Sequence, residues 1–293
     1  MYTRFSPCLF LLLFQFLCLY NAKGQINTQE PIIDKHGVIT LTLSSPHVGG
    51  KTKIQIIKPE LASNRVLYLL PVTPWPGYEE KWKKLGSGVD EIIKHDYHNT
   101  YGYTVVIPHF PKHMPWFVNH VSDPERQHET YIMETLLPFV DKYLGKEKPI
   151  RHLVGFSKSG YGSLNLLLRY PDTFHAVSVW DPGGIHKAYE PDNNNSLSGA
   201  AGSQEHFNRY QLTVPLAANR HHFQDSTRIA ISGYSNDKFL ERLHYLRGYL
   251  EQEEIQFIYK EDIHVSHRWY TGWLEYALGS LQKMNTPKPR LDE

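Results

Sequence analysis

The chain has 293 residues, a formal net charge of +1 and an aromatic content of 13%. Its length suits one α/β domain with a full hydrophobic core once a leader is removed. A net charge this close to zero excludes the basic field that a nucleic-acid-binding domain needs, so we expect no nucleic-acid partner. The sequence also lacks a Walker loop and a Rossmann glycine fingerprint, which excludes the usual nucleotide cofactors.

The first 24 residues have the pattern of a secretory signal peptide. Arg4 supplies the positive charge, residues 9–19 are almost continuously apolar, and small and polar residues follow at 21–25. The apolar run is short for a membrane span. We therefore expect cleavage near Gly24, a secreted or periplasmic mature domain of residues 25–293, and no stable membrane insertion after cleavage. An uncleaved anchor is the alternative.

Both cysteines of the chain, Cys8 and Cys18, lie inside this leader. The mature domain therefore has no disulfide and no thiolate chemistry, and its stability must come from its core.

The mature chain alternates predicted strands and helices. Two edge strands with alternating apolar and polar residues are predicted at 38–44 and 53–58, joined by a turn. More continuously apolar strands are predicted at 65–70, 103–108, 176–180, 229–232 and 255–259, and helices at 88–95, 123–143, 163–170, 239–250 and 269–278. This alternation predicts one α/β domain with a mainly parallel sheet and helices on both faces.

Two irregular segments interrupt this pattern. Residues 109–124 are rich in aromatic residues and proline, and residues 191–225 begin with a polar, asparagine-rich stretch. Long loops in a compact domain are often functional. We interpret the first segment as a binding loop or as a surface loop held by its own aromatic residues. The second is interpreted as an insertion or lid over the strand ends.

The central motif is the sequence Gly155-x-Ser157-x-Ser159-Gly160, which ends a short apolar run and precedes a long amphipathic one. A strand, a sharp turn and a helix with serine at the apex present a nucleophilic hydroxyl clear of the backbone. Gly155 and Gly160 fit a turn in which strand and helix backbones lie close together. Ser159 stands where the usual pattern has its last glycine. The alternative is a strand-to-helix turn in which Ser157 is only the N-cap of the helix.

Residues 155–164 and the sequence Arg169-Tyr170-Pro171-Asp172-Thr173-Phe174 resemble the α/β-hydrolase fold, in particular secreted esterases related to esterase D and the feruloyl esterases. The resemblance extends over about residues 66–273. It implies an α/β-hydrolase fold and a serine hydrolase, most specifically a carboxylesterase that cleaves acyl esters of small molecules or polysaccharides through an acyl-enzyme.

The resemblance implies a triad in the chain order serine, acid, histidine. Asp237 follows the strand at 229–232 and matches the acid position of the related esterases, although a helix N-cap is its alternative role. His267 follows the last strand and precedes Trp269, as in the esterases' histidine motif, and His264 is its rival. Two further carboxylates could replace Asp237 as the acid, namely Glu261 and Asp262.

Backbone amides should hold the oxyanion of the tetrahedral intermediate. One comes from Lys158, directly after the nucleophile, and the other from Thr73 or Val72 in the loop after the strand at 65–70. The related esterases often carry His-Gly in that loop, where this chain has Pro71-Val72-Thr73, so the second assignment is the weaker one.

Four further residues are expected at the substrate site. Trp180 and Asp181 end a strand beside the predicted elbow strand, and Trp116 and His120 lie in the aromatic loop. A role of the tryptophans in the core is the alternative. The seventeen histidines show no H-E-x-x-H spacing, so we expect no catalytic metal and no cofactor.

Other functions on the same scaffold stay open at this point. A serine peptidase or acyltransferase would use the same triad, whereas a non-catalytic binding protein would retain only the fold. The altered loop at 71–73 and Ser159 favour the binding protein, while the ordered set of Ser157, an acid and His267 favours the esterase.

Overall fold

The computed structural model describes residues 30–72, 85–110, 115–185, 188–233, 235–262 and 264–284. The predicted leader, residues 1–24, lies outside this part of the chain. Among the described residues, no helix is both long and apolar enough to cross a membrane.

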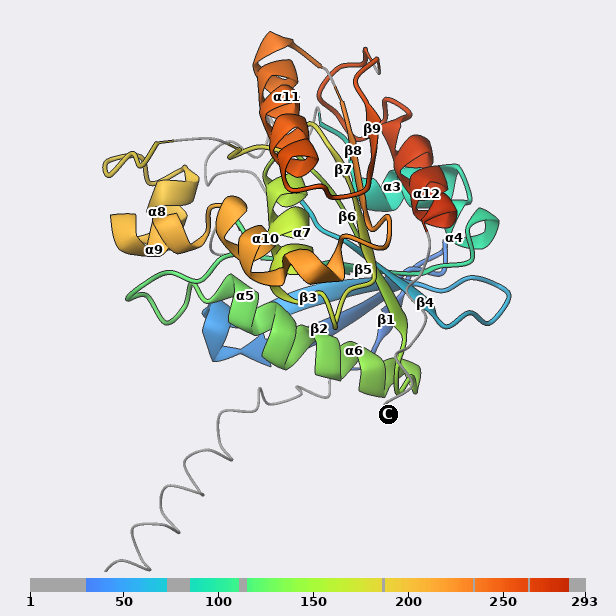
Figure 1. The fold of residues 1–293 in the computed structure, drawn as a ribbon. Coiled ribbons are helices and arrows are strands. Elements are labelled where there is room, and N and C mark those ends of the chain that lie inside the picture. The colour runs from blue at the N-terminus through green and yellow to red at the C-terminus, as the bar shows by residue number, and fades with distance from the viewer. Residues whose placement is uncertain are drawn as a thin grey trace, which may run out of the picture.

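A twisted sheet runs through the centre of the domain (Figure 1). In the described residues it has nine strands in the order β1-β2-β3-β5-β4-β6-β7-β8-β9. The strand bounds are β1 (Ile32–Ile33), β2 (Ile39–Ser45), β3 (Gly50–Ile57), β4 (Arg65–Leu69), β5 (Thr104–Pro108), β6 (Ile150–Phe156), β7 (Ala176–Trp180), β8 (Ile229–Ser232) and β9 (Phe257–Lys260).

Strand direction divides the sheet into two parts. β1, β2 and β3 pair antiparallel, and β3 joins β5 antiparallel. Every pair from β5 through β4, β6, β7 and β8 to β9 is parallel. Because parallel neighbours need crossover connections, helices must cover the sheet. The mainly parallel α/β sheet expected from the sequence is confirmed.

Helices cover both faces of this sheet (Figure 1). One face carries η2, a π-helix (Tyr131–Leu136), with α6 (Leu137–Leu144), α7 (Ser157–Arg169), α10 (Thr213–Asn219) and α11 (Asp237–Gln252), and the other carries α3 (Gly88–Lys94), α4 (Tyr97–Thr100) and α12 (Trp273–Lys283). The shorter elements are η1 (Pro46–Val48), α5 (His128–Thr130), α8 (Leu197–Ala201), α9 (Gln204–Arg209) and η3 (Arg220–His222).

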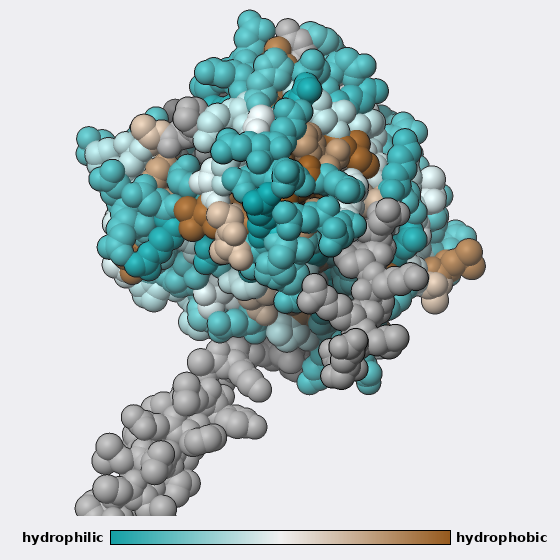
Figure 2. Space-filling model, viewed as in Figure 1, coloured by the Kyte–Doolittle hydropathy of each residue, from teal (hydrophilic) through white to brown (hydrophobic). Residues whose placement is uncertain are grey.

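The strand pattern explains the two hydrophobic cores between these layers. In β4, Val66 and Tyr68 face the core beneath α7, while Leu67 and Leu69 face the core beneath α12. Successive strand residues point to opposite faces, so a strand buried on both faces must be continuously apolar. The face shown in Figure 2 is largely hydrophilic, with small separate hydrophobic patches. Such scattered exposed residues are normal for a protein surface.

Two predicted helices begin later than expected. The helix predicted at 123–143 begins at His128, because Asn119 pairs with Gln127 and its side-chain oxygen accepts the Thr130 N–H at 3.1 Å. These contacts hold the preceding residues in a loop. The helix predicted at 269–278 begins at Trp273, after Gly272 in the left-handed region at φ +86°.

The segment predicted as an insertion or lid contains α8, α9 and α10. Leu197 and Ala201 of α8 are buried, and the Ala201 carbonyl accepts the backbone N–H of Val121 at 3.0 Å. α8 therefore packs against the aromatic loop.

Candidate active site

A sharp elbow between β6 and α7 presents Ser157. β6 ends at Phe156, and α7 begins at Ser157, whose φ is +55°. A non-glycine residue rarely adopts this left-handed conformation, which costs free energy and needs support from its surroundings. The loop after β7 supplies that support, because the Ser157 N–H donates to the Asp181 carbonyl at 3.1 Å and the Gly183 N–H donates to the Ser157 carbonyl at 2.7 Å.

The glycines of the motif fit this close packing. A Cβ at Gly155 would lie 2.3 Å from the backbone oxygen of Ser159, so the strand and helix backbones leave no room for a side chain. A Cβ at Gly160 would lie 3.1 Å from Cα of Pro182, in the loop after β7. Gly160 thus lets that loop approach the helix, and the Gly155 backbone oxygen of the elbow strand would lie 3.4 Å from the same Cβ.

Ser159 replaces the usual glycine without blocking the elbow. Its hydroxyl oxygen accepts the N–H of Phe156 at 3.1 Å and its O–H donates to the Phe156 carbonyl at 2.9 Å. This side chain satisfies backbone groups at the fully buried end of β6, so the departure from the usual motif is compatible with the elbow geometry.

His267 is held by a carboxylate and by aromatic rings. Its Nδ1 lies 3.1 Å from Oδ2 of Asp181, which is fully buried. A carboxylate oxygen is an acceptor, so this contact orients Nδ1 toward Asp181 and leaves Nε2 on the opposite side of the ring. The imidazole stacks on Trp180 with 5.5 Å between ring centroids and on Phe239 with 4.4 Å, and it also contacts Phe156, the neighbour of Ser157, at 5.0 Å.

The loop after β8 closes around the Asp181 carboxylate. The backbone N–H of Ser235 donates to Oδ2 of Asp181 at 3.3 Å. Gly233 follows β8, and a Cβ there would lie 2.3 Å from Oδ1 of Asp181. Asp181 itself has a positive φ of 44°. The Asp181 carboxylate is therefore held in one orientation by the backbone of Gly233 and Ser235, while the Asp181 backbone itself is strained.

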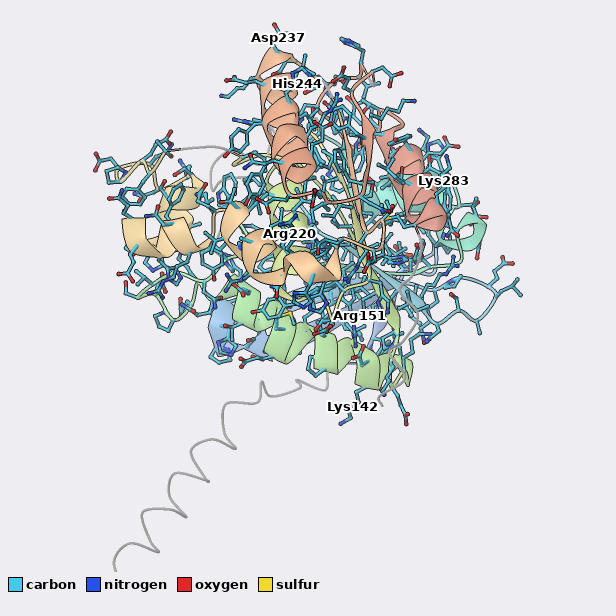
Figure 3. The ribbon with its side chains drawn as sticks, in the orientation of Figure 1. Lys142, Arg151, Arg220, Asp237, His244 and Lys283 are labelled. Atoms are coloured by element: carbon cyan, nitrogen blue, oxygen red, sulfur yellow. The ribbon has the colours of Figure 1, made fainter. Side chains whose placement is uncertain are left out.

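The carboxylate beside His267 is thus Asp181 and not Asp237, which was predicted at that position; Asp181 was predicted at the substrate site. Asp237 is the exposed first residue of α11, and Figure 3 shows it at the free end of that helix. α11 contacts His267 through the ring of Phe239. β7 lies directly beside the elbow strand β6, so Asp181 follows the neighbouring strand, whereas β8, which precedes Asp237, lies one strand further away.

The other rivals lie elsewhere. His264 is exposed on the loop between β9 and α12. Glu261 accepts from His244 at 2.9 Å and from the Tyr259 hydroxyl at 2.8 Å, and Asp262 lies 3.6 Å from the Lys260 ammonium.

The candidate oxyanion residues are only partly described. Lys158 follows Ser157 in the first turn of α7, and burial lowers the pKa of its ammonium to about 7. Val72 is half-buried and lines a pocket of about 220 Å³ together with Leu69 and Trp269. Thr73 lies outside the described residues. The pocket lies beside the end of β4, next to the loop expected to supply the second amide.

The residues predicted for substrate binding have mainly interior contacts. Trp180 is fully buried and stacks on Trp273 at 5.5 Å, so it supports the His267 ring from inside the protein. Trp116 is 7% exposed and packs edge-on against Tyr161 at 5.8 Å. These contacts match the alternative reading of both tryptophans as core residues.

His120 organises the aromatic loop. Its Nδ1 accepts the backbone N–H groups of Ser122 and Asp123 at 3.2 and 3.0 Å. Burial lowers the pKa of its imidazole, which suits a ring nitrogen that acts as an acceptor. Within the described ranges, no group of three or more histidine, cysteine or acidic side chains could hold a metal ion.

The chain is similar to known esterases in sequence and in fold. Residues 111–247 match the family model described as "Putative esterase", a stretch that includes Ser157, Asp181 and Asp237 and ends before His267. No curated protein matches the chain in sequence.

Three solved structures illustrate the shared fold. A ferulic acid esterase superposes with a TM-score of 0.62 at 16% identity, covering 89% of this chain and 99% of its own. An S-formylglutathione hydrolase from Agrobacterium tumefaciens gives 0.59 at 14% identity, covering 86% and 98%. The substrate-bound fluorophosphonate-binding serine hydrolase F of Staphylococcus aureus gives 0.56 at 13% identity, covering 89% and 98%.

The fold is therefore that of the α/β-hydrolases. The match of residues 111–247 to the esterase family model, together with this fold, supports a carboxylic ester hydrolase.

Proposed function

We propose that this protein is a serine carboxylesterase that uses Ser157 as nucleophile, His267 as base and Asp181 as the orienting acid. The observation that carries the proposal is the 3.1 Å contact between His267 Nδ1 and the buried Asp181 carboxylate, beside the elbow that presents Ser157. A nucleophile, a base and an orienting acid make up the triad of acyl-transfer enzymes, and this contact supports the pairing of base and acid.

The mechanism follows from these roles. His267 removes the Ser157 proton through Nε2 as the hydroxyl oxygen attacks the acyl carbonyl, and Asp181 stabilises the imidazolium. The amides of Lys158 and of the loop at Val72 or Thr73 donate to the oxyanion. His267 then protonates the leaving alcohol, and water releases the acyl group from Ser157 by the same route.

Substitution of the nucleophile tests this proposal. Ser157→Ala should reduce turnover of p-nitrophenyl butyrate on the order of a million-fold, because the acyl-enzyme cannot form. Ser280→Ala is the matched control, since Ser280 is a buried serine in α12 whose hydroxyl donates to the Tyr276 carbonyl. Equal hydrolysis by the parent and Ser157→Ala would remove Ser157 from the mechanism. A parent that hydrolyses no ester would favour the binding-protein alternative.

Export belongs to the same proposal. The charged start, apolar run and polar end of residues 1–24 support a cleaved signal peptide and a secreted or periplasmic enzyme. N-terminal sequencing of exported protein should give a start near Gln25, and an intact Met1 would contradict cleavage.

We also propose that the acyl esters include those on polysaccharides. The resemblance to feruloyl esterases and the fold shared with a ferulic acid esterase support this choice. Release of free acid from acylated xylan is the measurement, and hydrolysis of small esters without any release from the polymer would contradict it.

A further inference from the structure

Arg242 of α11 forms part of a stack that ends on His267. Its guanidinium carbon lies 5.0 Å from the ring centroid of Phe239, and the same ring stacks on the His267 imidazole at 4.4 Å with an interplanar angle of 17°. α11 begins at the carboxyl end of the parallel sheet, as the positions of Asp237 and of Arg151 near the start of β6 show in Figure 3. Arg242 is therefore a cation beside the proposed triad.

This arginine lacks the partner that a half-buried cation normally has. Within the part of the chain that the structure describes, Arg242 has no ion pair and no hydrogen-bond acceptor. Arg247 on the same helix differs, because its Nε donates to Glu251 at 2.8 Å. Burial lowers the pKa of Arg242, whereas the charges of Glu241 and Asp181 raise it. Since partial burial of an unpaired charge costs free energy, an anionic ligand is expected.

The neighbouring residues of α11 show which way this part of the helix faces. Tyr245 and Leu246, about one turn after Arg242, line a small cavity of about 30 Å³ together with Gly184. Gly184 lies three residues beyond Asp181 in the loop after β7. This face of α11 therefore meets the loop that carries the orienting acid.

We propose that Arg242 binds a carboxylate carried by the ester substrate, so that the enzyme prefers anionic esters. The inference rests on the proposed esterase function and names its substrate class. A guanidinium can donate two parallel hydrogen bonds to a carboxylate, and stacking on Phe239 fixes its plane before the ligand arrives. The carboxylate would replace the missing partner of Arg242 and hold the substrate beside His267.

Matched pairs of esters test the preference on both sides of the scissile bond. On the acyl side the pair is mono-p-nitrophenyl succinate and p-nitrophenyl pentanoate. On the alcohol side it is the acetyl ester of p-hydroxyphenylpropionic acid and the methyl ester of that compound. Arg242→Gln should lower kcat/KM for the anionic member of at least one pair about tenfold, the loss expected for a hydrogen bond to a charged group. The neutral members should change less than about twofold.

Two variants separate this role from a structural one. Arg242→Lys keeps the charge and should retain part of the anionic preference, whereas Arg247→Gln, on the same helix, should leave it unchanged. Equal ratios of anionic to neutral turnover in the parent and Arg242→Gln, for both pairs, would overturn the inference. Turnover of the neutral esters reports separately on the proposed function.

A binding measurement removes the dependence on turnover. Calorimetry should show that both anionic esters bind to the Ser157→Ala variant. In the double variant Ser157→Ala/Arg242→Gln, the affinity for at least one of these esters should be about tenfold weaker. Equal affinities of the single and the double variant for both anionic esters would also overturn the proposal.

Discussion

The two aspartates Asp181 and Asp237 show what sequence can establish for single residues. Ser157 is marked by its flanking glycine and by the strand and helix around it, and His267 by its place after the last strand. Both aspartates follow strands and both lie between the serine and the histidine in the chain. The choice depends on which carboxylate lies against His267. That carboxylate is held by contacts such as the Ser235 N–H to Asp181 Oδ2, which have no signal in the sequence of one chain.

The aromatic rings around the proposed base, His267, could not be predicted from the sequence either. Phe239 and Trp180 stack on His267 from elements far apart in the chain, α11 and β7. Hydrophobic periodicity predicts that both residues are buried or half-buried, but not that they share one imidazole. Rings stacked on the imidazole restrict its rotation, so it can keep Nδ1 toward Asp181.

A buried histidine of β6 should make the fold sensitive to acid. Burial first, and then the charges of His175 and Arg65, lowers the pKa of His152 to about 3, and its Nδ1 lies 2.6 Å from the Tyr103 hydroxyl oxygen. Between the unfolded value of about 6.5 and this folded value, only the unfolded chain binds the proton. Stability should therefore fall with falling pH in this window, by about 1.4 kcal/mol per pH unit from this group.

Denaturant unfolding between pH 7 and pH 4 measures this contribution. His152→Gln should show a shallower loss of stability than the parent, and His264→Gln at an exposed position should follow the parent. Parallel losses in the parent and His152→Gln would show that the His152 environment is not the cause.

Strands and helices were predictable where one periodicity dominates. β5 and β7 are buried on both faces, and their largely apolar sequences predict both strands. The start of the helix after the aromatic loop was missed, because Asp123 and Pro124 favour a helix start locally. A side-chain contact from Asn119 to Thr130 keeps residues 119–127 out of the helix. A contact between residues eleven positions apart leaves no periodic pattern in the sequence, so it could not be predicted.

The elbow should tolerate no side chain at Gly155. A Cβ there would overlap the Ser159 backbone oxygen at 2.3 Å, which cannot move without displacing α7. Gly155→Ala should therefore destabilise the fold by about 3 kcal/mol, the upper range for overpacking.

Gly248→Ala provides the opposite case for the same substitution. A Cβ at Gly248, in α11, meets no atom within 4 Å, so the variant should gain about 0.5 to 1 kcal/mol from helix propensity. Thermal unfolding of both variants is the measurement. A Gly155→Ala protein as stable as the parent would contradict the close contact between strand and helix.

The overall fold of the molecule was easier to predict from the sequence than its elements or its single residues. Alternating strands and helices predicted a mainly parallel α/β sheet, and the resemblance to esterases implied the α/β-hydrolase fold. The sheet order and the solved structures confirm both. Specific function is decided by loops at the carboxyl edge of the sheet, where the chain carries its least periodic sequence. The loop after β7 supplies Asp181, and α11 brings Phe239 and Arg242 to the same edge.

The central claim, a Ser157–His267–Asp181 triad, is tested most directly by comparing Asp181→Asn with Asp237→Asn on p-nitrophenyl butyrate. Both substitutions remove one charge and retain the side-chain shape, and thermal unfolding verifies that each variant is folded. Asp181→Asn should lower kcat about ten-thousand-fold, because the amide favours the wrong imidazole tautomer. Asp237→Asn should change kcat less than about threefold, since Asp237 is exposed at the start of α11. The reverse result, with Asp181→Asn active and Asp237→Asn inactive, would contradict the account.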